Sequence, residues 1–291
     1  MTEHTSTHTI SVQQAATIGR RKAMEDETLT TSINKNAYLY AVLDGHSGKD
    51  TVIYVKSRLP SLLSELVSFY RPDSLQAPIE RAILRLDRES LKLGHEDGTT
   101  LCAVLHVGTL LYFINVGDSR AILLQDGQRI FATSDHKPHL EKERIKKAGG
   151  VVITVDVPRL NGTLAVSRAI GDHESKSRGL SAFPTVTQYV LDTESTYTIL
   201  LATDGFWDCF NNDRATDLAN IATTTGMIET ALRSPKYTND NVSIVKVTIS
   251  PRLAVANASR SEMWIFFGLV LVSTIIFLSF TSWVRESEVE N

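Results

Sequence analysis

Four aspartates stand beside predicted strand ends, where carboxylates can share a cleft. Asp44 ends the run YLYAVL and Asp118 follows YFINVG, while Asp204 follows TILLAT and Asp240 is separated from VSIVKVTI by one residue. A carboxylate at such a place can point into a cleft while the strand fixes its backbone. One Asp-Gly or Asp-Asn dipeptide would be explained as a turn. Four of them beside apolar strands are not explained by turns alone.

Carboxylates in this arrangement suit hard divalent cations. Mg²⁺ and Mn²⁺ prefer oxygen ligands, keep several waters and need few protein ligands. With Glu25 and Asp26 upstream, the four aspartates could hold two ions bridged by one carboxylate and one water. Two ions about 3.5–4 Å apart can generate a hydroxide near neutral pH and offset charge in an in-line phosphoryl displacement. The pattern therefore predicts a two-metal phosphoester hydrolase.

Nine segments occur in an order that resembles the metal-dependent protein phosphatases of type 2C. They are GRRKAMED, YAVLDGHSG, DGTT, FINVGDSRAILL, SDHKP, EKERIKKAGGVV, NGTLAVSRAIGD, LLATDGFWD and TNDNVSIV, and they span about residues 15–250. One motif alone is moderately specific, whereas the ordered set is highly specific. EKERIKKAGG and NGTLAVSRAIGD are similar to the mitochondrial-matrix branch that acts on branched-chain keto-acid dehydrogenase. The resemblance implies a protein serine/threonine phosphatase.

The resemblance also implies roles for individual residues. Arg21 would bind the substrate phosphate, for which a planar guanidinium is suited. His46 would be the general acid for the leaving alkoxide. The nucleophile would be the water that bridges two Mg²⁺ or Mn²⁺ ions, so no phospho-enzyme would form. The expected metal site contains Asp44 as the bridging carboxylate, the Gly45 carbonyl, Asp204 and Asp240 as direct ligands, Glu25 and Asp26 largely through water, and Asp118 and Asp208 at a looser third-metal position.

Several of these residues have simpler interpretations. His46 could cap a helix or be a buried donor, and Asp208 could cap the helix that follows it. Asp118 could stabilise a hairpin turn. We expect Asp172, in AIGDH, to be a structural turn residue. We expect Arg168 to brace the site or its loop through salt bridges and do not assign it a catalytic role.

Two departures from the family pattern bear on the site. Ser47 stands where the family most often has glycine, which matters only if φ is positive there. Thr185 stands where an acidic residue is common, so one loop contact stays open. Every metal-ligand position is retained, which argues against an inactive, phosphatase-like interaction module. A metal-dependent hydrolase of small phosphate esters stays open as a second alternative.

Apolar runs predict the elements that must position these residues. Strands are expected over 38–43, 100–107, 110–115, 121–124, 198–202 and 242–249, and Gly108-Thr109 predicts a hairpin. Two amphipathic helices are expected within 50–93 and a short helix over 140–148. Hairpins with helices grouped between them favour an antiparallel α+β fold. The resemblance implies a four-layer α/β/β/α sandwich of two antiparallel sheets flanked by helices.

A long apolar stretch lies near the end of the sequence. Residues 263–284 carry no charge over 22 residues, which gives about 33 Å of helix for a hydrocarbon core of roughly 30 Å. Trp264 and Trp283 stand near its ends, as at membrane interfaces. We expect a single-pass tail anchor in the endoplasmic reticulum or the mitochondrial outer membrane, with a cytosolic catalytic domain. The expected order is a disordered tail (1–14), the catalytic domain (15–250), a linker (251–262), the transmembrane helix (263–284) and a short lumenal or intermembrane tail (285–291).

The composition excludes some other classes of function. A net charge of −3 over 291 residues gives no electrostatic case for nucleic-acid binding. Cys102 and Cys209 are too few for a disulfide framework or a zinc cluster, and we expect both to be buried. Neither is followed six residues later by the arginine of a cysteine-dependent phosphatase loop. We expect a monomeric catalytic domain whose partners are phosphoproteins and a membrane.

Overall fold

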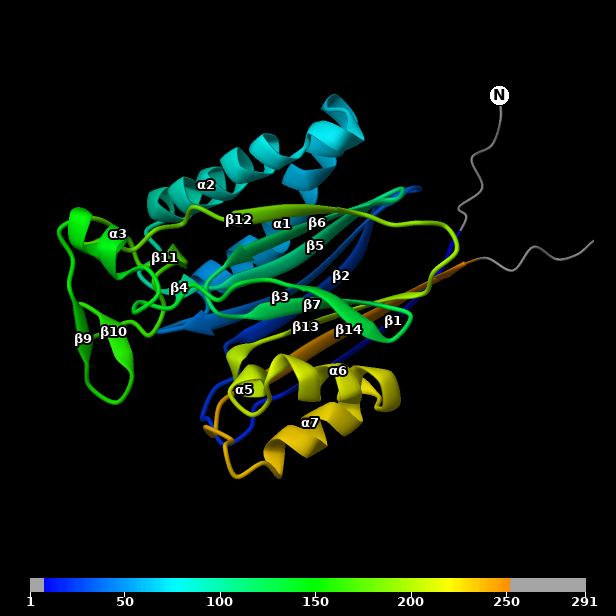
Figure 1. The fold of residues 1–291 in the computed structure, drawn as a ribbon. Coiled ribbons are helices and arrows are strands. Elements are labelled where there is room, and N and C mark those ends of the chain that lie inside the picture. The colour runs from blue at the N-terminus through cyan, green and yellow to red at the C-terminus, as the bar shows by residue number, and fades with distance from the viewer. Residues whose placement is uncertain (1–7, 252–291) are drawn as a thin grey trace, which may run out of the picture. The chain divides into compact units, whose positions relative to one another are not determined.

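Two antiparallel β-sheets lie face to face, with helices on their outer faces (Figure 1). The protein is seen here in a computed structural model that describes residues 8–251. One sheet has five strands in the order β1-β14-β13-β7-β8. The other has seven strands in the order β11-β4-β3-β5-β6-β12, with β2 also paired to β3. A separate hairpin is formed by β9 and β10.

The elements have the following bounds. The five-stranded sheet contains β1 (His8–Thr17), β7 (Arg120–Gln125), β8 (Gln128–Ala132), β13 (Tyr197–Ala202) and β14 (Val242–Pro251). The seven-stranded sheet contains β2 (Asp26–Asn34), β3 (Ala37–His46), β4 (Gly98–Thr99), β5 (Leu101–Val107), β6 (Leu110–Val116), β11 (Ile170–Gly171) and β12 (Thr185–Val190), and the separate hairpin contains β9 (Val152–Thr154) and β10 (Pro158–Leu160). The helices are α1 (Asp50–Phe69), η1 (Pro72–Ser74), α2 (Gln76–Lys92), α3 (Lys142–Lys147), α4 (His173–Lys176), α5 (Asp204–Trp207), α6 (Asn212–Ile221) and α7 (Thr224–Leu232).

The side chains of β3 alternate between two cores. Leu39 and Leu43 pack against α1 and α2 on the outer face of the larger sheet. Tyr40 and Val42 face the second sheet and pack in the core between the sheets. A third core lies between the smaller sheet and α5–α7. Because side chains on a strand alternate with a period of two, Asp44 continues the second set and faces the space between the sheets.

The antiparallel α+β fold predicted from the sequence is confirmed. The predicted strands correspond to β3, β5, β6, β7, β13 and β14, and the predicted helices to α1, α2 and α3. Strands β1, β2 and β12 were not predicted. All three lie at sheet edges, where one side faces solvent and polar residues are common.

The predicted disordered tail over residues 1–14 is wrong for residues 8–14. These residues form most of β1, which pairs along its whole length with β14. The pairing joins residues 225 to 243 positions apart, so no local pattern could reveal it. Both cysteines are buried and unpaired, as expected.

Residues 8–251 contain no helix that is both long and apolar enough to cross a bilayer. The predicted transmembrane helix over 263–284 lies outside the described residues. The same holds for the predicted linker beyond Pro251 and for the predicted tail over 285–291.

Candidate active site

Carboxylates from both sheets meet at one end of the space between the sheets. Asp44, Asp118 and Asp204 each offer an oxygen, and these three atoms lie within 4.8 Å of one another. Asp44 belongs to β3, Asp118 follows β6, and Asp204 begins α5 just after β13. The structure therefore brings together three of the four aspartates that the sequence pattern selected.

Asp26 and Asp240 lie beside this cluster. Asp26 begins β2 and stands opposite Asp44 in the β2–β3 register. It is buried, and its Oδ2 accepts a hydrogen bond from the Thr203 hydroxyl at 2.9 Å. Asp240 precedes β14 and forms an ion pair with Arg21, whose Nη2 lies 2.6 Å from the Asp240 Oδ2. The negative charges of Asp26 and Asp240 both raise the pKa of Asp44.

Burial and mutual repulsion disfavour ionisation of these carboxyl groups. Burial is the main cause that raises the pKa of Asp44 and of Asp118 well above the ordinary range, and the charge of Asp204 is the next. Burial, helped by the charge of Asp240, raises the pKa of Asp204 to about 6. Burial also raises the pKa of Asp26 to about 7, although hydrogen bonds from neighbouring hydroxyls oppose it. Excess negative charge in a dry site is what a bound cation stabilises.

Asp208 lies at the rim of the cluster and shares one cation with Asp118. The Lys137 Nζ lies 3.8 Å from the Asp208 Oδ1. Burial raises the pKa of both Asp118 and Asp208, and the positive charge of Lys137 partly offsets this rise. Asp208 does not cap the next helix, because Asn211 does so by accepting a hydrogen bond from the Arg214 N–H. The alternative role weighed for Asp208 is therefore excluded.

Gly45 allows a close backbone approach next to the cluster. A Cβ at Gly45 would lie 2.5 Å from the Glu25 carbonyl oxygen, to which the Gly45 N–H donates at 3.2 Å. The Glu25 carboxylate accepts a hydrogen bond from the Gly48 N–H at 3.0 Å. Glu25 thus holds the chain on both sides of His46 and is not one of the three converging carboxylates. The donor set is made of oxygen, which fits Mg²⁺ or Mn²⁺.

Asn241 supports the site but was not selected from the sequence. Its Oδ1 accepts from the Glu25 N–H at 2.8 Å, and its Nδ2 donates to the carbonyls of Ile18 and Ala23 at 2.8 and 3.1 Å. It therefore fastens both ends of the loop that carries Arg21. The signal in the sequence is the asparagine that follows Asp240 in the motif TNDNVSIV.

His46 contacts a carboxylate outside the cluster. Its Nε2 lies 2.7 Å from the Oδ2 of Asp172, and the two side chains are 26% and 9% exposed. Asp172 does occupy a turn, with φ of +49°, yet the interpretation of a purely structural residue missed this contact. Ser47 has φ of +64°. It therefore stands in the left-handed region that favours glycine, so this departure from the family pattern has a conformational cost.

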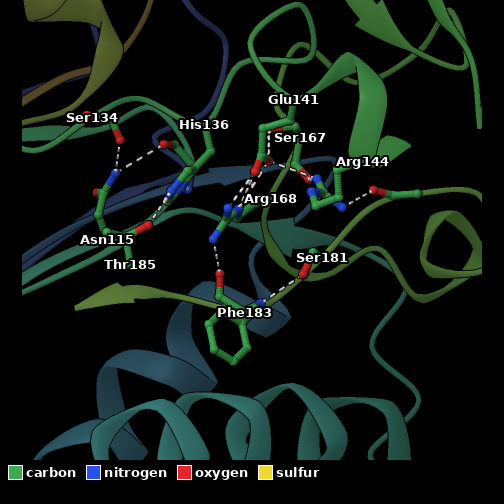
Figure 2. A network of polar contacts seen from close by, with 12 residues as sticks. Asn115, Ser134, His136, Glu141, Arg144, Ser167, Arg168, Ser181, Phe183 and Thr185 are labelled. Atoms are coloured by element: carbon green, nitrogen blue, oxygen red, sulfur yellow. Dashed lines mark hydrogen bonds and ion pairs between the residues drawn. The ribbon is translucent and has the colours of Figure 1, made fainter. Parts of the chain in front are cut away.

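A buried histidine, His136, lies on the segment that joins β8 to β12 and contacts Thr185 at the start of β12 (Figure 2). The His136 Nδ1 accepts from the N–H of Gly117, which precedes Asp118, at 3.1 Å. Its Nε2 therefore carries the hydrogen and donates to the Thr185 Oγ1 at 2.9 Å. Burial lowers the pKa of His136 to about 4, which keeps the ring neutral. The sequence did not show which loop contact Thr185 makes in place of the acidic residue common in the family. In the structure, Thr185 makes this hydrogen bond with His136.

Arg168 braces the same segment, as the sequence predicted. Its Nε donates to the Glu141 Oε1 at 3.0 Å, and its Nη1 donates to the Phe183 carbonyl at 2.8 Å (Figure 2). Glu141 also accepts from Arg144 and from the Ser167 hydroxyl. Hydrogen bonds from these side chains outweigh burial and lower the pKa of Glu141 to about 2. The network links α3 to the chain on both sides of β11.

Comparisons with known proteins give one consistent result. A family model described as "Protein phosphatase 2C" matches residues 10–235. "Probable protein phosphatase 2C 55" from Oryza sativa subsp. japonica is 35% identical over 240 residues, which are 78% of this chain and 62% of that protein. "Protein phosphatase 1L" from Bos taurus is 36% identical over 214 residues, which are 68% of this chain and 59% of that protein. The chain spans about three fifths of the length of these two relatives.

A solved structure shows the same fold. The crystal structure of a phosphatase from a pathogenic strain of Toxoplasma gondii matches with a TM-score of 0.72 and 25% identity. The match covers 84% of this chain and 96% of that one. The likeness therefore extends over both sheets and their flanking helices.

Proposed function

The chain belongs to the protein phosphatase 2C family, and from this premise we propose that it is a metal-dependent protein serine/threonine phosphatase. Members of this family use Mg²⁺ or Mn²⁺. The observation that carries the proposal is the convergence of Asp44, Asp118 and Asp204, whose oxygens lie within 4.8 Å of one another. Their raised pKa values show that ionisation is disfavoured in the metal-free site, and bound cations would stabilise the ionised carboxylates.

The metal positions can be assigned to individual residues of the cluster and its neighbours. Bound in pairs, such ions supply an activated water and offset charge during an in-line displacement at phosphorus. The proposed ligands of two ions are Asp44, Gly45, Asp204 and Asp240, with Glu25 and Asp26 acting through water and with Asp118 and Asp208 at a third, weaker position.

Two further residues would act on the substrate itself. The Arg21 side chain is 53% exposed beside Asp240, so its guanidinium is accessible to a phosphate group, which it can bind through two parallel hydrogen bonds. His46, at the end of β3, would give a proton to the oxygen of the departing serine or threonine as the P–O bond breaks. The proposed substrates are phosphoproteins.

The proposed activity can be tested with the full chain in detergent. We expect hydrolysis of a phosphothreonine peptide that needs Mn²⁺, stops in EDTA and is lost in Asp204→Asn. An exposed control, Asp73→Asn on the α1–α2 connection, should retain full activity. No hydrolysis with Mn²⁺ would contradict the proposal and favour an interaction module. Higher kcat/KM on small phosphate esters than on the phosphopeptide would favour a hydrolase of small esters.

We also propose that the catalytic domain, which begins with β1 and ends with β14 (residues 8–251), is monomeric and is tethered to a membrane with its site in the cytosol. The support is the uncharged sequence of residues 263–284, with 251–262 as linker and 285–291 as a tail beyond the membrane. The wording EKERIKKAGG supports kinship with the branched-chain keto-acid dehydrogenase phosphatase branch. A fluorescent protein fused to residues 250–291 should label the endoplasmic reticulum or the mitochondrial outer membrane. Diffuse fluorescence would contradict the tether.

A further inference from the structure

We propose that Asp172 is a positioning residue for His46, so that the imidazole acts on the substrate through Nδ1 in one fixed orientation. The inference rests on the proposed phosphatase function and on the proposed role of His46. Asp172 lies 126 positions from His46 in the sequence, and its Oδ2 lies 2.7 Å from the His46 Nε2. Because an ionised carboxylate only accepts hydrogen bonds, Nε2 must carry the hydrogen. Nδ1 is then the nitrogen that remains for the leaving group.

Three short strands bring the two side chains together. Gly98 of β4 is paired with His46 on one side and with Gly171 of β11 on the other. Asp172 follows Gly171 directly, and its N–H donates to the Asp97 carbonyl at 3.0 Å. The position of Asp172 beside His46 is therefore fixed by backbone pairing across β3, β4 and β11.

The backbone at Asp172 is unusual for a residue with a side chain. Its φ of +49° lies in the left-handed region, which only glycine adopts readily and which aspartate and asparagine tolerate better than other residues. A glycine would serve the turn at less cost. The presence of an aspartate at this position is explained if its carboxylate holds the His46 ring in place.

Gly98 leaves the space in which this contact forms. A Cβ on Gly98 would lie 2.0 Å from the Asp172 Oδ2 and 2.6 Å from the His46 Nε2. Both distances are far below van der Waals contact. A methyl group at residue 98 would therefore push the two groups apart, although neither of them would be changed. This gives a second way to break the contact.

The contact fits the proposed proton transfer. As the P–O bond breaks, its electron pair goes to the departing oxygen, and the Nδ1–H bond of protonated His46 breaks as an O–H bond forms on that oxygen. The neutral imidazole that results keeps its hydrogen on Nε2, and Asp172 still accepts it. A ring held in this way presents Nδ1 throughout, whereas a ring without the contact can rotate or adopt the other tautomer.

The competing explanation is that Asp172 only stabilises its loop. Asp87 offers a matched control, because it supports the same loop without touching His46. The Asp87 Oδ1 accepts from the Gly171 N–H at 2.9 Å and lies 2.9 Å from the Lys176 Nζ. A loop defect from Asp87→Asn should affect all substrates alike. A defect in His46 should instead depend on the leaving group.

The first experiment compares two esters with the full chain, Mn²⁺ and detergent. Phenyl phosphate has a poor leaving group that needs a proton, and 4-nitrophenyl phosphate has a good one that does not. His46→Ala and Asp172→Asn should each lower kcat on phenyl phosphate by about 10–100-fold and on 4-nitrophenyl phosphate by less than about 3-fold. The double variant should be no worse than His46→Ala. Asp87→Asn should show equal, small losses on both esters.

The second experiment observes the ring itself. ¹⁵N NMR of the imidazole should show His46 as the Nε2–H tautomer in the wild type. Asp172→Asn and Gly98→Ala should both lose the fixed tautomer while keeping a cooperative unfolding transition. Gly98→Ala should reproduce the leaving-group dependence of Asp172→Asn, because its methyl group would separate the two side chains by steric clash without changing either of them.

Several results would overturn the inference. Equal losses on both esters in Asp172→Asn, or a further loss when it is added to His46→Ala, would assign Asp172 a structural role. An unchanged His46 tautomer in Asp172→Asn would do the same. A wild-type chain that hydrolyses neither ester, nor the phosphothreonine peptide, would overturn the proposed function and this inference together. An active wild type with an insensitive Asp172→Asn would overturn the inference alone.

Discussion

At the scale of single residues, the surroundings of Asp44 strongly disfavour its ionised form. It is enclosed by the cluster, and the charges of Asp204, Asp26, Asp118 and Asp240 all raise its pKa. Removing one charge from such a group relieves repulsion in the metal-free protein and removes a ligand from the metal-bound protein. The same substitution should therefore affect stability and activity in opposite directions.

We expect Asp44→Asn to lower turnover with Mn²⁺ by more than about 100-fold. Substituting a residue that only hydrogen-bonds to a metal ligand commonly lowers metal affinity or activity by about 10–100-fold, and Asp44 is itself a proposed ligand. In EDTA the variant should unfold about 2–4 °C higher than wild type, which corresponds to about 1 kcal/mol for a domain of this size. Mn²⁺ should raise the midpoint of the wild type and not that of the variant. Differential scanning calorimetry checks the stability, and a lower midpoint for the variant in EDTA would contradict the repulsion argument.

The raised pKa values of Asp26 and Asp204 predict how stability depends on pH. Their folded pKa values, about 7 and about 6, lie above the ordinary 3.8. The folded protein thus binds more protons than the unfolded chain between about pH 4 and pH 7. This stabilisation is complete below the unfolded pKa and is lost as the pH rises through the folded pKa. In EDTA, the unfolding midpoint should fall by about 5–10 °C from pH 5.5 to pH 8.

Two controls separate this effect from other titrations. Asp26→Asn should show a flatter decline in EDTA, because it removes the group with the larger shift. Saturating Mn²⁺ should flatten or reverse the decline, because metal ions bind the ionised carboxylates. A metal-free midpoint that is higher at pH 8 than at pH 5.5 would show that these carboxyl groups are not raised.

At the scale of elements, the loop between β1 and β2 depends on one amide side chain. Asn241 binds the loop at three backbone groups, and the loop carries Arg21. Asn241→Ala would leave buried groups without partners, which costs about 1–3 kcal/mol. We expect KM for a phosphopeptide to rise by about 10-fold or more, with a smaller change in kcat, because the phosphate-binding arginine loses its fixed position.

A matched control for this variant lies on the far side of the smaller sheet. Asn220→Ala removes a single hydrogen bond, from Nδ2 to the Gly127 carbonyl, on the exposed surface. We expect it to leave KM unchanged and to cost less than about 1 kcal/mol of stability. An Asn241→Ala enzyme with normal KM would mean that Arg21 is positioned by other contacts.

The strands that could be predicted are those whose residues are buried on both faces of a sheet. Strand β5 is buried at every position, so it forms an apolar run that the sequence shows directly. Strand β2, DETLTTSIN, lies at an edge and lacks such a run. It nevertheless carries Asp26 into register with Asp44. The aspartates could be selected because they follow visible strands, whereas Asp172 and Asn241 act across pairings that no local pattern encodes.

At the scale of the whole molecule, the first and last described strands complete one sheet together. Strand β14 lies between β1 and β13, with His8 opposite Pro251. Its Val245, Val247 and Ile249 are fully buried in the core between the sheets. The family match ends at residue 235, so it stops before an element that the fold requires. A chain that stops before β14 would lose the strand to which both β1 and β13 are hydrogen-bonded.

Truncation tests this dependence. A fragment of residues 1–255 keeps β14, so it should unfold cooperatively and hydrolyse a phosphopeptide with Mn²⁺ as fast as the full chain. A fragment of residues 1–240 should not fold, because losing β14 exposes β1 and β13 and removes the six buried side chains of β14, against a typical total stability of only about 5–15 kcal/mol. Circular dichroism and turnover check both. Cooperative unfolding of 1–240 would contradict the argument, and an inactive but folded 1–255 would show that the residues after 255 do more than tether the enzyme.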